Sequence, residues 1–381
     1  MAAGNEGDGK GVMTLLLGQW GDQILITEEV LKAAAGNSES GKEVMTLLLD
    51  SRGDQISVTE EVVKAAAENY VSGKEVMTLL FDRRGDQIPV TEDVVRTVAG
   101  RLNGQVMKLL FDQWGDQIPV TEEIVRAAAG NHGSSKEVMT LLIDWWGDQI
   151  SVTEEVVKAA AGNYGSGKEV MTLLFDWRGD QIPVTEEIVK AAAGNEGVGR
   201  EVMALLFDQR REVTTALITE EIFMAAATCG QIPVLDLLSQ QTGLISVQEE
   251  WRYIAKLYNA AKAGSIGSIE QLIHKGTKPD MRNIRGETPL WIAAMYGHHA
   301  VVKALAQRTD VNVNSTSITG RSPLFRPSEK GDEWAVSILM EAGADPNLVD
   351  ESGDTAAIVA RKNGHERIVK ILEHWGQNKP P

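Results

Sequence analysis

The sequence predicts an all-α solenoid of stacked helix-turn-helix repeats, and three observations lead to this prediction. The chain has 381 residues, more than the roughly 250–300 at which a single hydrophobic core stops growing. Near-identical segments recur every 32 residues, with one interval of 30, and are marked by Met13, Met45, Met77, Met107, Met139, Met171 and Met203. A second type of repeat follows, in which Gly286, Gly320 and Gly353 stand 34 and 33 residues apart. Such periods are typical of arrays in which each unit packs on its neighbours.

Each 32-residue unit predicts two helices joined by a turn, and residues 42–73 are a clear copy. The first helix, Glu43 to Asp50, is apolar on too many sides for a free surface helix, so neighbouring units must cover it. A Gly-Asp-Gln turn then leads into a short extended stretch with Ile56 and Val58 on one side. The second helix begins after Thr59, a residue suited to cap free N–H groups, and its Ala run allows close helix packing.

Charge and repeat type divide the chain into parts. Residues 1–229 form seven 32-residue units and hold 20 basic and 37 acidic side chains, whereas residues 230–381 hold 17 of each. Residues 230–256 are expected to form a degenerate repeat and junction, residues 257–376 about four repeats of the second type, and residues 377–381 a tail. The coincidence of the two changes predicts two segments of different origin.

The second segment resembles ankyrin repeats. The stretch GETPLWIAAMYGHHAVVKALAQ contains the family's Thr-Pro-Leu opening at Thr288, its paired alanines at Ala293, and its Gly-His turn at Gly297. A divergent first copy is expected over residues 257–283. Pro327 stands where the family has an alanine, so we expect a short or bent helix there. The 32-residue units resemble ankyrin repeats more distantly, and near-identical units of this kind are similar to those of fungal ankyrin-repeat proteins. The resemblance implies a stacked binding surface and no catalytic site.

The 32-residue units differ mainly at two adjacent positions after the first helix. These pairs are Gln19-Trp20, Ser51-Arg52, Arg83-Arg84, Gln113-Trp114, Trp145-Trp146, Trp177-Arg178 and Gln209-Arg210. A core position keeps one shape because close packing is sensitive to a single methylene, so swaps between Trp and Arg predict exposure to water. Both residue types are enriched in binding hot spots. The candidate partner-binding residues are therefore Trp20, Arg52, Arg83, Arg84, Trp114, Trp145, Trp146, Trp177, Arg178 and Arg210. Neutral drift at tolerant surface positions is the alternative explanation.

No residue pattern predicts catalysis, a cofactor or a metal site. Residues 162–168 satisfy G-x-x-x-x-G-K, but Glu169 follows where Mg²⁺ binding needs Ser or Thr, and a helix is predicted before the motif instead of a strand. Turns and helix caps explain the acidic row Asp22, Asp54, Asp86, Asp116, Asp148 and Asp180. The single Cys229 excludes an internal disulfide and fits a cytosolic or nuclear location.

Composition restricts the partners and leaves three functional interpretations open. A net charge of -17 disfavours nucleic acid, and no run approaches the roughly 18 apolar residues that a membrane span needs. We expect a non-enzymatic protein-interaction scaffold or recognition arm whose protein partner has a basic surface. One alternative is a structural protein that self-associates through its repeats. The other is a fragment of a larger protein, because residues 2–7 reproduce residues 192–197 and the chain begins in mid-repeat. The resemblance to fungal repeat arrays implies that such a protein is a signalling protein in which this chain is the sensor arm, with its switch domain absent from this sequence.

Overall fold

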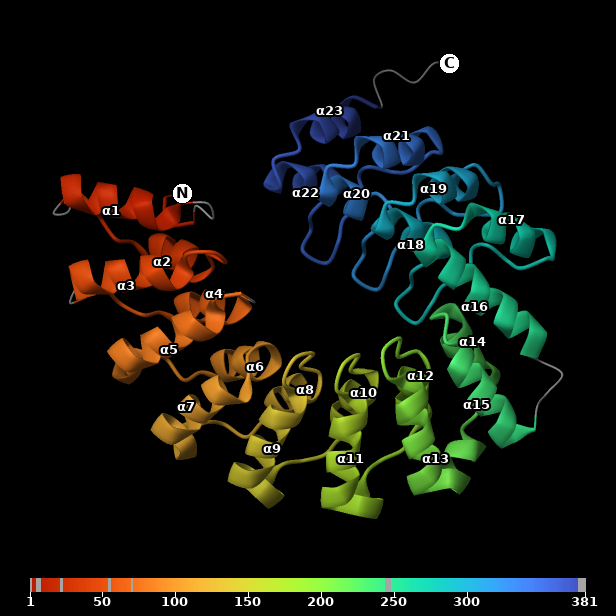
Figure 1. The fold of residues 1–381 in the computed structure, drawn as a ribbon, viewed down its shortest axis with the longest axis horizontal. Coiled ribbons are helices and arrows are strands. Elements are labelled where there is room, and N and C mark those ends of the chain that lie inside the picture. The colour runs from red at the N-terminus through yellow and green to blue at the C-terminus, as the bar shows by residue number, and fades with distance from the viewer. Residues whose placement is uncertain are drawn as a thin grey trace. The chain divides into compact units, whose positions relative to one another are not determined.

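The computed structural model describes residues 2–4, 8–20, 23–53, 56–69, 71–243 and 248–375. In this part of the chain the regular elements are helices, apart from one isolated bridge between Val349 and Thr355. The predicted all-α fold of repeated helix pairs is therefore confirmed (Figure 1). Contacts divide the chain into two compact units, residues 1–188 and 189–381, so the change of repeat type near residue 229 falls inside the second unit.

The helices of the first unit alternate between two layers. They are α1 (Gly9–Trp20), α2 (Glu28–Ala35), α3 (Gly41–Arg52), α4 (Glu60–Glu68), α5 (Gly73–Arg84), α6 (Glu92–Arg101), α7 (Gly104–Trp114), α8 (Glu122–Ala129), α9 (Ser135–Trp146), α10 (Glu154–Gly162) and α11 (Gly167–Arg178), and α12 (Glu186–Ala193) crosses the division. Odd-numbered helices pack on odd-numbered neighbours and even-numbered helices on even-numbered ones (Figure 1). Each helix therefore has a counterpart in the next repeat as its lateral neighbour.

The core of the first unit repeats the same apolar positions. Val44, Met45 and Leu48 of α3 are fully buried, as are Val62 and Ala66 of α4. Burial of each valine, leucine or methionine side chain of this kind contributes roughly 1.5–3 kcal/mol. Ile56 and Val58, in the connection between these helices, are also buried, as the period-2 pattern predicted.

A buried asparagine joins successive repeats, and the sequence analysis did not identify it. The Asn163 side chain donates through Nδ2 to the carbonyls of Ala129 and Asn131 in the preceding repeat, at 2.9 Å each. Its Oδ1 accepts from the backbone N–H groups of Gly165 and Ser166. Equivalent buried residues are Asn37, Asn69, Asn131 and Asn195. Buried polar groups are favourable only when they are hydrogen-bonded, and this side chain satisfies four backbone groups at once.

The predicted threonine caps are present in only some of the repeats. Thr121 and Thr153 accept hydrogen bonds from the backbone N–H groups of Ile124 and Val156. Thr59 makes no such capping bond, and its hydroxyl instead donates to Glu28 of the preceding repeat. The prediction for Thr59 is therefore wrong, although the bond to Glu28 is not itself the reason, because Thr153 donates to Glu122 in the same way and still caps its helix.

The second unit continues the alternation with helices that vary more in length. They are α13 (Gly199–Ala216), α14 (Glu220–Thr228), α15 (Ile232–Thr242), α16 (Gln248–Ala263), α17 (Ile266–His274), α18 (Pro289–Tyr296), α19 (His299–Ala306), α20 (Phe325–Lys330), α21 (Glu333–Glu341), α22 (Ala356–Lys362) and α23 (Glu366–His374). The six-residue α20 contains Pro327 and is short, as predicted. The loop glycines Gly286, Gly320 and Gly353 share a φ of 75–76°, a left-handed conformation that glycine adopts without strain.

The junction between the two repeat types is a single helix. Helix α16 runs without interruption through the boundary placed between residues 256 and 257, and it contacts α14 and α15 as well as α17 and α18. It therefore acts both as the second helix of the degenerate 32-residue repeat and as the first helix of the first ankyrin-like repeat.

Candidate functional site

The variable pairs of the first unit lie where each odd-numbered helix ends and its Gly turn begins. We name this row the pair edge, formed by residues 19–20, 51–52, 83–84, 113–114, 145–146 and 177–178. Arg210 belongs to the second unit and marks a kink in α13, with φ −140° and ψ 49°. The seventh pair thus lies within a longer helix because no Gly-Asp-Gln turn ends it.

The two positions of a pair differ in exposure. At the first position Arg83, Gln113 and Trp145 are exposed, with Trp145 at 44%, whereas Trp177 is half-buried. At the second position Arg52, Arg84, Trp114, Arg178 and Arg210 are half-buried, and only Trp20, in the first repeat, is exposed, at 50%.

The expectation that water surrounds every candidate is wrong for Trp146. This indole is only 7% exposed and meets Phe111 of the preceding repeat edge to face, with ring centroids 5.2 Å apart. Trp and Arg can interchange near such a site because both extend a long, flat group across a neighbouring surface. The variability of the second position therefore indicates that these side chains are partly covered by the preceding repeat and are not fully exposed to water.

Aromatic contacts tie the pair edge to the repeat before it. The ring of Trp114 lies 5.6 Å from Phe81, and the ring of Trp145 stacks on Phe111 at 5.1 Å with an interplanar angle of 15°. Such pairs add about 0.5–1.5 kcal/mol beyond the area they bury. The face of Trp145 opposite Phe111 is the part of this indole that is free to meet a partner.

Side chains of the pair edge also cover the preceding Gly turns. A Cβ at Gly115 would lie 2.9 Å from Cζ3 of Trp145, and a Cβ at Gly53 would lie 2.7 Å from a guanidinium nitrogen of Arg84. By contrast, Gly147 and Gly179 have φ values of 46° and 51°, and a Cβ added at either would meet no atom within 4 Å. At the earlier turns a Cβ would displace the end of a neighbouring side chain, whereas the later two turns require glycine for their backbone conformation.

Two arginines of the pair edge contact aspartates of the preceding repeat. Nη1 of Arg83 lies 3.3 Å from Asp50, and Nη1 of Arg178 lies 3.1 Å from Asp148. The guanidinium of Arg178 also lies over the indole of Trp177, 4.1 Å from the ring centroid. The edge therefore combines carboxylates, guanidinium groups and indoles.

Acidic residues of the even-numbered helices form ion pairs with lysines of the same repeat and of the neighbouring repeat. Lys64 lies 2.6 Å from Glu60 of its own helix and 3.2 Å from Asp93 of the next repeat. Hydrogen bonds from Arg96 and then Lys64 lower the pKa of Asp93. Lys158 contacts Glu155 and Glu187 in the same way. Because these acids pair with basic residues of the chain itself, their recurrence in successive repeats needs no bound ligand to explain it.

The motifs that resemble catalytic or ligand-binding signatures have structural roles in the described residues. Helix α10 precedes the G-x-x-x-x-G-K stretch, and Gly167 is the buried first residue of α11, so the motif is an interhelical turn. Burial raises the pKa of the Cys229 thiol to about 12, which makes it a poor nucleophile. Of the acidic turn residues, Asp148 and Asp180 are described, whereas the side chains of Asp22, Asp54, Asp86 and Asp116 lie outside the described part. No group of three or more His, Cys, Asp or Glu among the described side chains could hold a metal ion.

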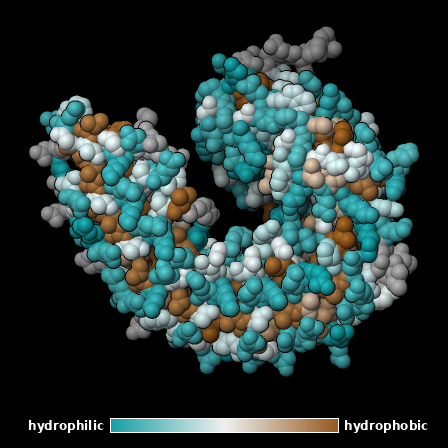
Figure 2. All heavy atoms as spheres, viewed as in Figure 1, coloured by the Kyte–Doolittle hydropathy of each residue, from teal (hydrophilic) through white to brown (hydrophobic). Residues whose placement is uncertain are grey.

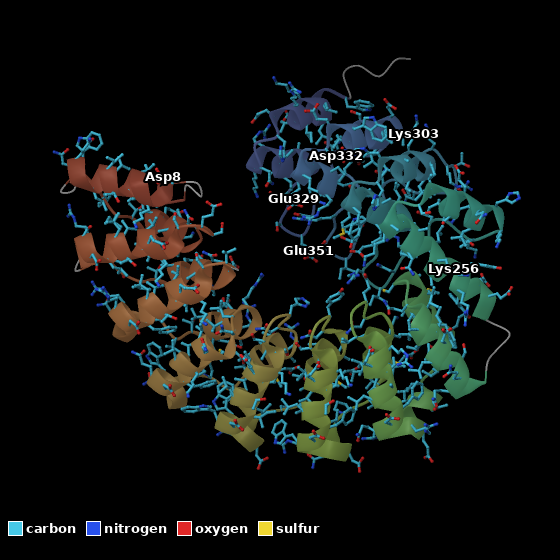
Figure 3. The ribbon with its side chains drawn as sticks, in the orientation of Figure 1. Asp8, Lys256, Lys303, Glu329, Asp332 and Glu351 are labelled. Atoms are coloured by element: carbon cyan, nitrogen blue, oxygen red, sulfur yellow. The ribbon has the colours of Figure 1, made fainter. Side chains whose placement is uncertain are left out.

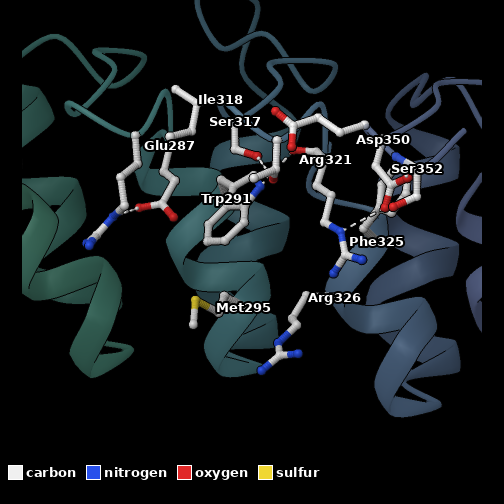
Figure 4. A pocket seen from close by; sticks show the side chains of 13 residues that line it. Glu287, Trp291, Met295, Ser317, Ile318, Arg321, Phe325, Arg326, Asp350 and Ser352 are labelled. Atoms are coloured by element: carbon white, nitrogen blue, oxygen red, sulfur yellow. Dashed lines mark hydrogen bonds and ion pairs between the residues drawn. The ribbon is translucent and has the colours of Figure 1, made fainter. Parts of the chain in front are cut away.

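A cavity of about 420 Å³ lies in the second unit, between the loops and helices α18 and α20 (Figure 4). The indole N–H of Trp291 donates to the carbonyl of Arg321, and Nε of Arg321 donates to Asp350 at 3.1 Å. Arg326 pairs with Glu329, which Figure 3 labels. The sequence analysis named no residue here, and its one local signal was the aromatic Trp291 after the Thr-Pro-Leu opening.

The surface visible in Figure 2 is largely hydrophilic, with apolar side chains in small separate groups. Across the residues that the structure describes, no helix combines the length and the apolar character that crossing a membrane would require.

Two family models match the chain. One, described as a domain of unknown function (DUF7104), matches residues 15–45, 47–77, 79–107, 109–139, 141–171 and 173–203. The other, described as ankyrin repeats (3 copies), matches residues 257–350. The two matched regions correspond to the two repeat types that the sequence predicted.

Curated relatives match the chain over part of its length. The putative ankyrin repeat protein YahD of Escherichia coli is 35% identical over 102 residues, which cover 25% of this chain and 51% of YahD. The inactive serine/threonine-protein kinase TEX14 of Mus musculus is 29% identical over 119 residues, 31% of this chain and 8% of that protein. The putative E3 ubiquitin-protein ligase XBAT34 of Arabidopsis thaliana is 28% identical over 119 residues, 31% of this chain and 32% of that protein. The chain thus spans about half of YahD and a smaller share of the other two.

Proposed function

We propose that the chain, whose residues 257–350 match the model of ankyrin repeats, is a non-catalytic scaffold that recognises a protein partner through the pair edge. Ankyrin repeats and their relatives support a role in protein–protein interaction. The pair edge supplies the finer assignment, because it is the surface of the near-identical repeats at which their side chains differ most.

The observation that carries this proposal is the exposed indole of Trp145. At 44% exposure it presents a large, rigid apolar surface to water in the middle of the first unit. Trp114 and Trp177 occupy the pairs on either side and are half-buried. Tryptophan is enriched in binding hot spots because it buries much area at little cost in side-chain entropy. A row of such residues at successive repeats gives an extended partner several anchor points.

The proposal is tested with ligands selected from a random peptide library against the full chain. We expect the double variant Trp145→Ser and Trp177→Ser to lose at least tenfold in affinity for them. The matched control is Trp334→Ser, because Trp334 is 47% exposed but lies on α21 of the second unit. Selected ligands that bind both variants equally would contradict recognition at the pair edge.

Self-association is a second candidate, and the first repeat favours it. Leu15 and Leu25 are 65% and 78% exposed, and Trp20 of the same repeat is 50% exposed. Static light scattering over a hundredfold range of concentration tests this candidate. Growth of the apparent mass that Leu15→Ser and Leu25→Ser abolish would support it, and a constant mass would reject it.

We also propose a cytosolic or nuclear location and partners other than nucleic acid. The net charge of -17 and the buried single thiol motivate these two proposals. The fungal origin and the sensor role suggested by the resemblance stay predictions. Localisation of the tagged chain, and a filter-binding assay with DNA and RNA at low salt, test the first two.

A further inference from the structure

The contact between Arg83 and Asp50 is a natural example of a cation bound at the pair edge. Asp50 is the last residue before its own pair, and Arg83 occupies the first pair position of the next repeat. Nη1 of Arg83 and a carboxylate oxygen of Asp50 are 3.3 Å apart, and both side chains are about half exposed, at 53% each. A guanidinium therefore fits beside this aspartate without the burial of either group.

The next three repeats present the same aspartate without its cation. The residues equivalent to Asp50 are Asp82, Asp112 and Asp144, and all three are exposed. The residues equivalent to Arg83 are Gln113, Trp145 and Trp177, which carry no charge. Among the described residues, no Lys, Arg or His nitrogen lies within 4.0 Å of these three carboxylates. Three successive acidic positions are thus left open to a cation from outside the chain.

An indole accompanies these open aspartates, and the chain itself shows how a guanidinium uses it. The guanidinium of Arg178 lies 4.1 Å from the centroid of the Trp177 ring while Nη1 contacts Asp148, which belongs to a Gly-Asp-Gln turn and not to the row of open aspartates. Trp145 stands next to Asp144 in the chain and takes the pair position that faces Asp112. An incoming guanidinium can therefore meet a carboxylate and an indole face together, a combination that adds cation–π attraction to the ion pair.

The distance between repeats restricts the conformation of the partner. Neighbouring packed helices are about 8–10 Å apart. A polyproline II segment rises about 3.1 Å per residue with 3 residues per turn, so every third side chain points the same way about 9 Å further on. In a β-strand, residues three apart point to opposite faces. The 9 Å period of a polyproline II segment with a cation at every third position therefore falls within the usual distance between packed helices of successive repeats.

We propose that the pair edge binds an extended, arginine-bearing segment of a protein partner, with guanidinium groups at every third position seated on Asp82, Asp112 and Asp144 beside the indole of Trp145. This inference rests on the proposed function and names the partner chemistry of the same surface. The excess of negative charge in residues 1–229 attracts such a segment over longer range and speeds the encounter.

The experiment uses the full chain and synthetic peptides of twelve residues. One peptide carries arginine at every third position between prolines and serines, and a second has the same composition with its arginines adjacent. Calorimetry at low and at physiological salt measures both affinities. We expect the spaced peptide to bind at least tenfold more tightly, and to weaken as salt rises. Equal affinity of the two peptides would overturn the proposal.

Three variants decide whether the named aspartates hold the peptide. The triple variant Asp82→Asn, Asp112→Asn and Asp144→Asn should lose at least tenfold in affinity. The control Glu43→Gln, Glu75→Gln and Glu169→Gln removes the same charge from exposed acids at the other end of odd-numbered helices and should change affinity less than twofold. Gln113→Arg should recreate the Arg83 contact at Asp82 and weaken peptide binding. Equal losses in the triple variant and its control would mean attraction to net charge alone and would reject the site.

The outcomes separate this inference from the proposed function. If library ligands still depend on Trp145 while neither arginine peptide binds, the recognition surface stands and the partner chemistry is wrong. If the spaced peptide binds through Asp82, Asp112 and Asp144 but the library ligands bind equally well without Trp145 and Trp177, the tryptophans are not the hot spot of the proposed function. The binding of arginine at the three aspartates is then still supported.

Discussion

The two units satisfy the same backbone demand with different side chains. In the first unit, the carbonyl of Ala129, at the end of α8, accepts from Asn163 of the next repeat. In the second unit, the corresponding carbonyls of Lys262 and Glu329 lie 2.8 and 3.0 Å from ring nitrogens of His298 and His365, and that of Met295 accepts from Lys330. Since a carbonyl only accepts, each imidazole nitrogen must donate.

The inter-repeat hydrogen bonds of the two units differ in how deeply they are buried and in how many backbone groups one side chain bonds to. Asn163 is buried and bonds to four backbone groups, whereas His298 is half-buried and contacts one carbonyl through a solvent-exposed hydrogen bond. A buried link that satisfies several groups allows little substitution, and an exposed link allows several residue types. The repeats of the first unit can therefore stay nearly identical inside while the pair edge varies, and this contrast makes the variation informative.

The largest expected effect is the loss of a buried asparagine. Asn163→Ala removes four hydrogen bonds and leaves buried backbone groups without partners, so we expect a loss of about 4 kcal/mol in the free energy of unfolding. Chemical denaturation measures the loss, and hydrogen exchange on peptides from α10 and α11 localises it. Asn314→Ala is the comparison variant, at a half-buried asparagine of the second unit whose side chain bonds to only two backbone groups, the carbonyl of Gly343 and the N–H of Asp345, and it should cost less. A loss below 1 kcal/mol would remove the contrast between the units.

The second effect separates the two positions of one pair. Trp146→Ala removes a buried indole, and we expect a loss of about 3 kcal/mol. Trp145→Ala removes an exposed ring stacked on Phe111, and we expect a loss of about 1 kcal/mol. Urea unfolding of both variants in parallel checks the order. Equal losses would mean that the pair does not divide into an inner and an outer residue.

The repeat period and the core positions could be predicted from the sequence because they rest on apolar residues with a fixed spacing. Met45 and Leu48 are buried as their period required. The burial of Trp146 was missed because a swap between Trp and Arg was interpreted as exposure, although both residue types at the pair edge can reach a glycine of the preceding repeat, as Arg84 and Trp145 do. Asn163 was missed because asparagine is common in turns, and only coordinates distinguish a turn residue from a buried link.

The third effect measures the exposed link of the second unit. His298→Ala removes one hydrogen bond to the carbonyl of Lys262, and water can replace the lost donor because the site is exposed. We expect a loss of about 1 kcal/mol, a quarter of that for Asn163→Ala. The same denaturation measurement applies, with His298→Asn as a variant that keeps a donor. A loss as large as that of the asparagine variant would show that burial does not distinguish the two links.

The smallest effect concerns an exposed ion pair between repeats. The pKa of Asp93 is lowered from its ordinary 3.8, first by the hydrogen bond from Arg96 and then by that from Lys64. A carboxylate whose pKa falls on folding stabilises the folded chain above its unfolded pKa, and this contribution is lost as the pH drops through the folded value. Asp93→Asn should therefore lower the urea midpoint slightly at pH 7, and the difference from the wild type should shrink as the pH falls below 3.8 and through the lowered pKa of the folded-state carboxylate. The pair of Arg308 and Asp310 in the second unit is the control, because it joins residues two apart and not two repeats. If Asp310→Asn has the same effect on the midpoint, the cross-repeat position of Asp93 adds nothing to the stability of the array.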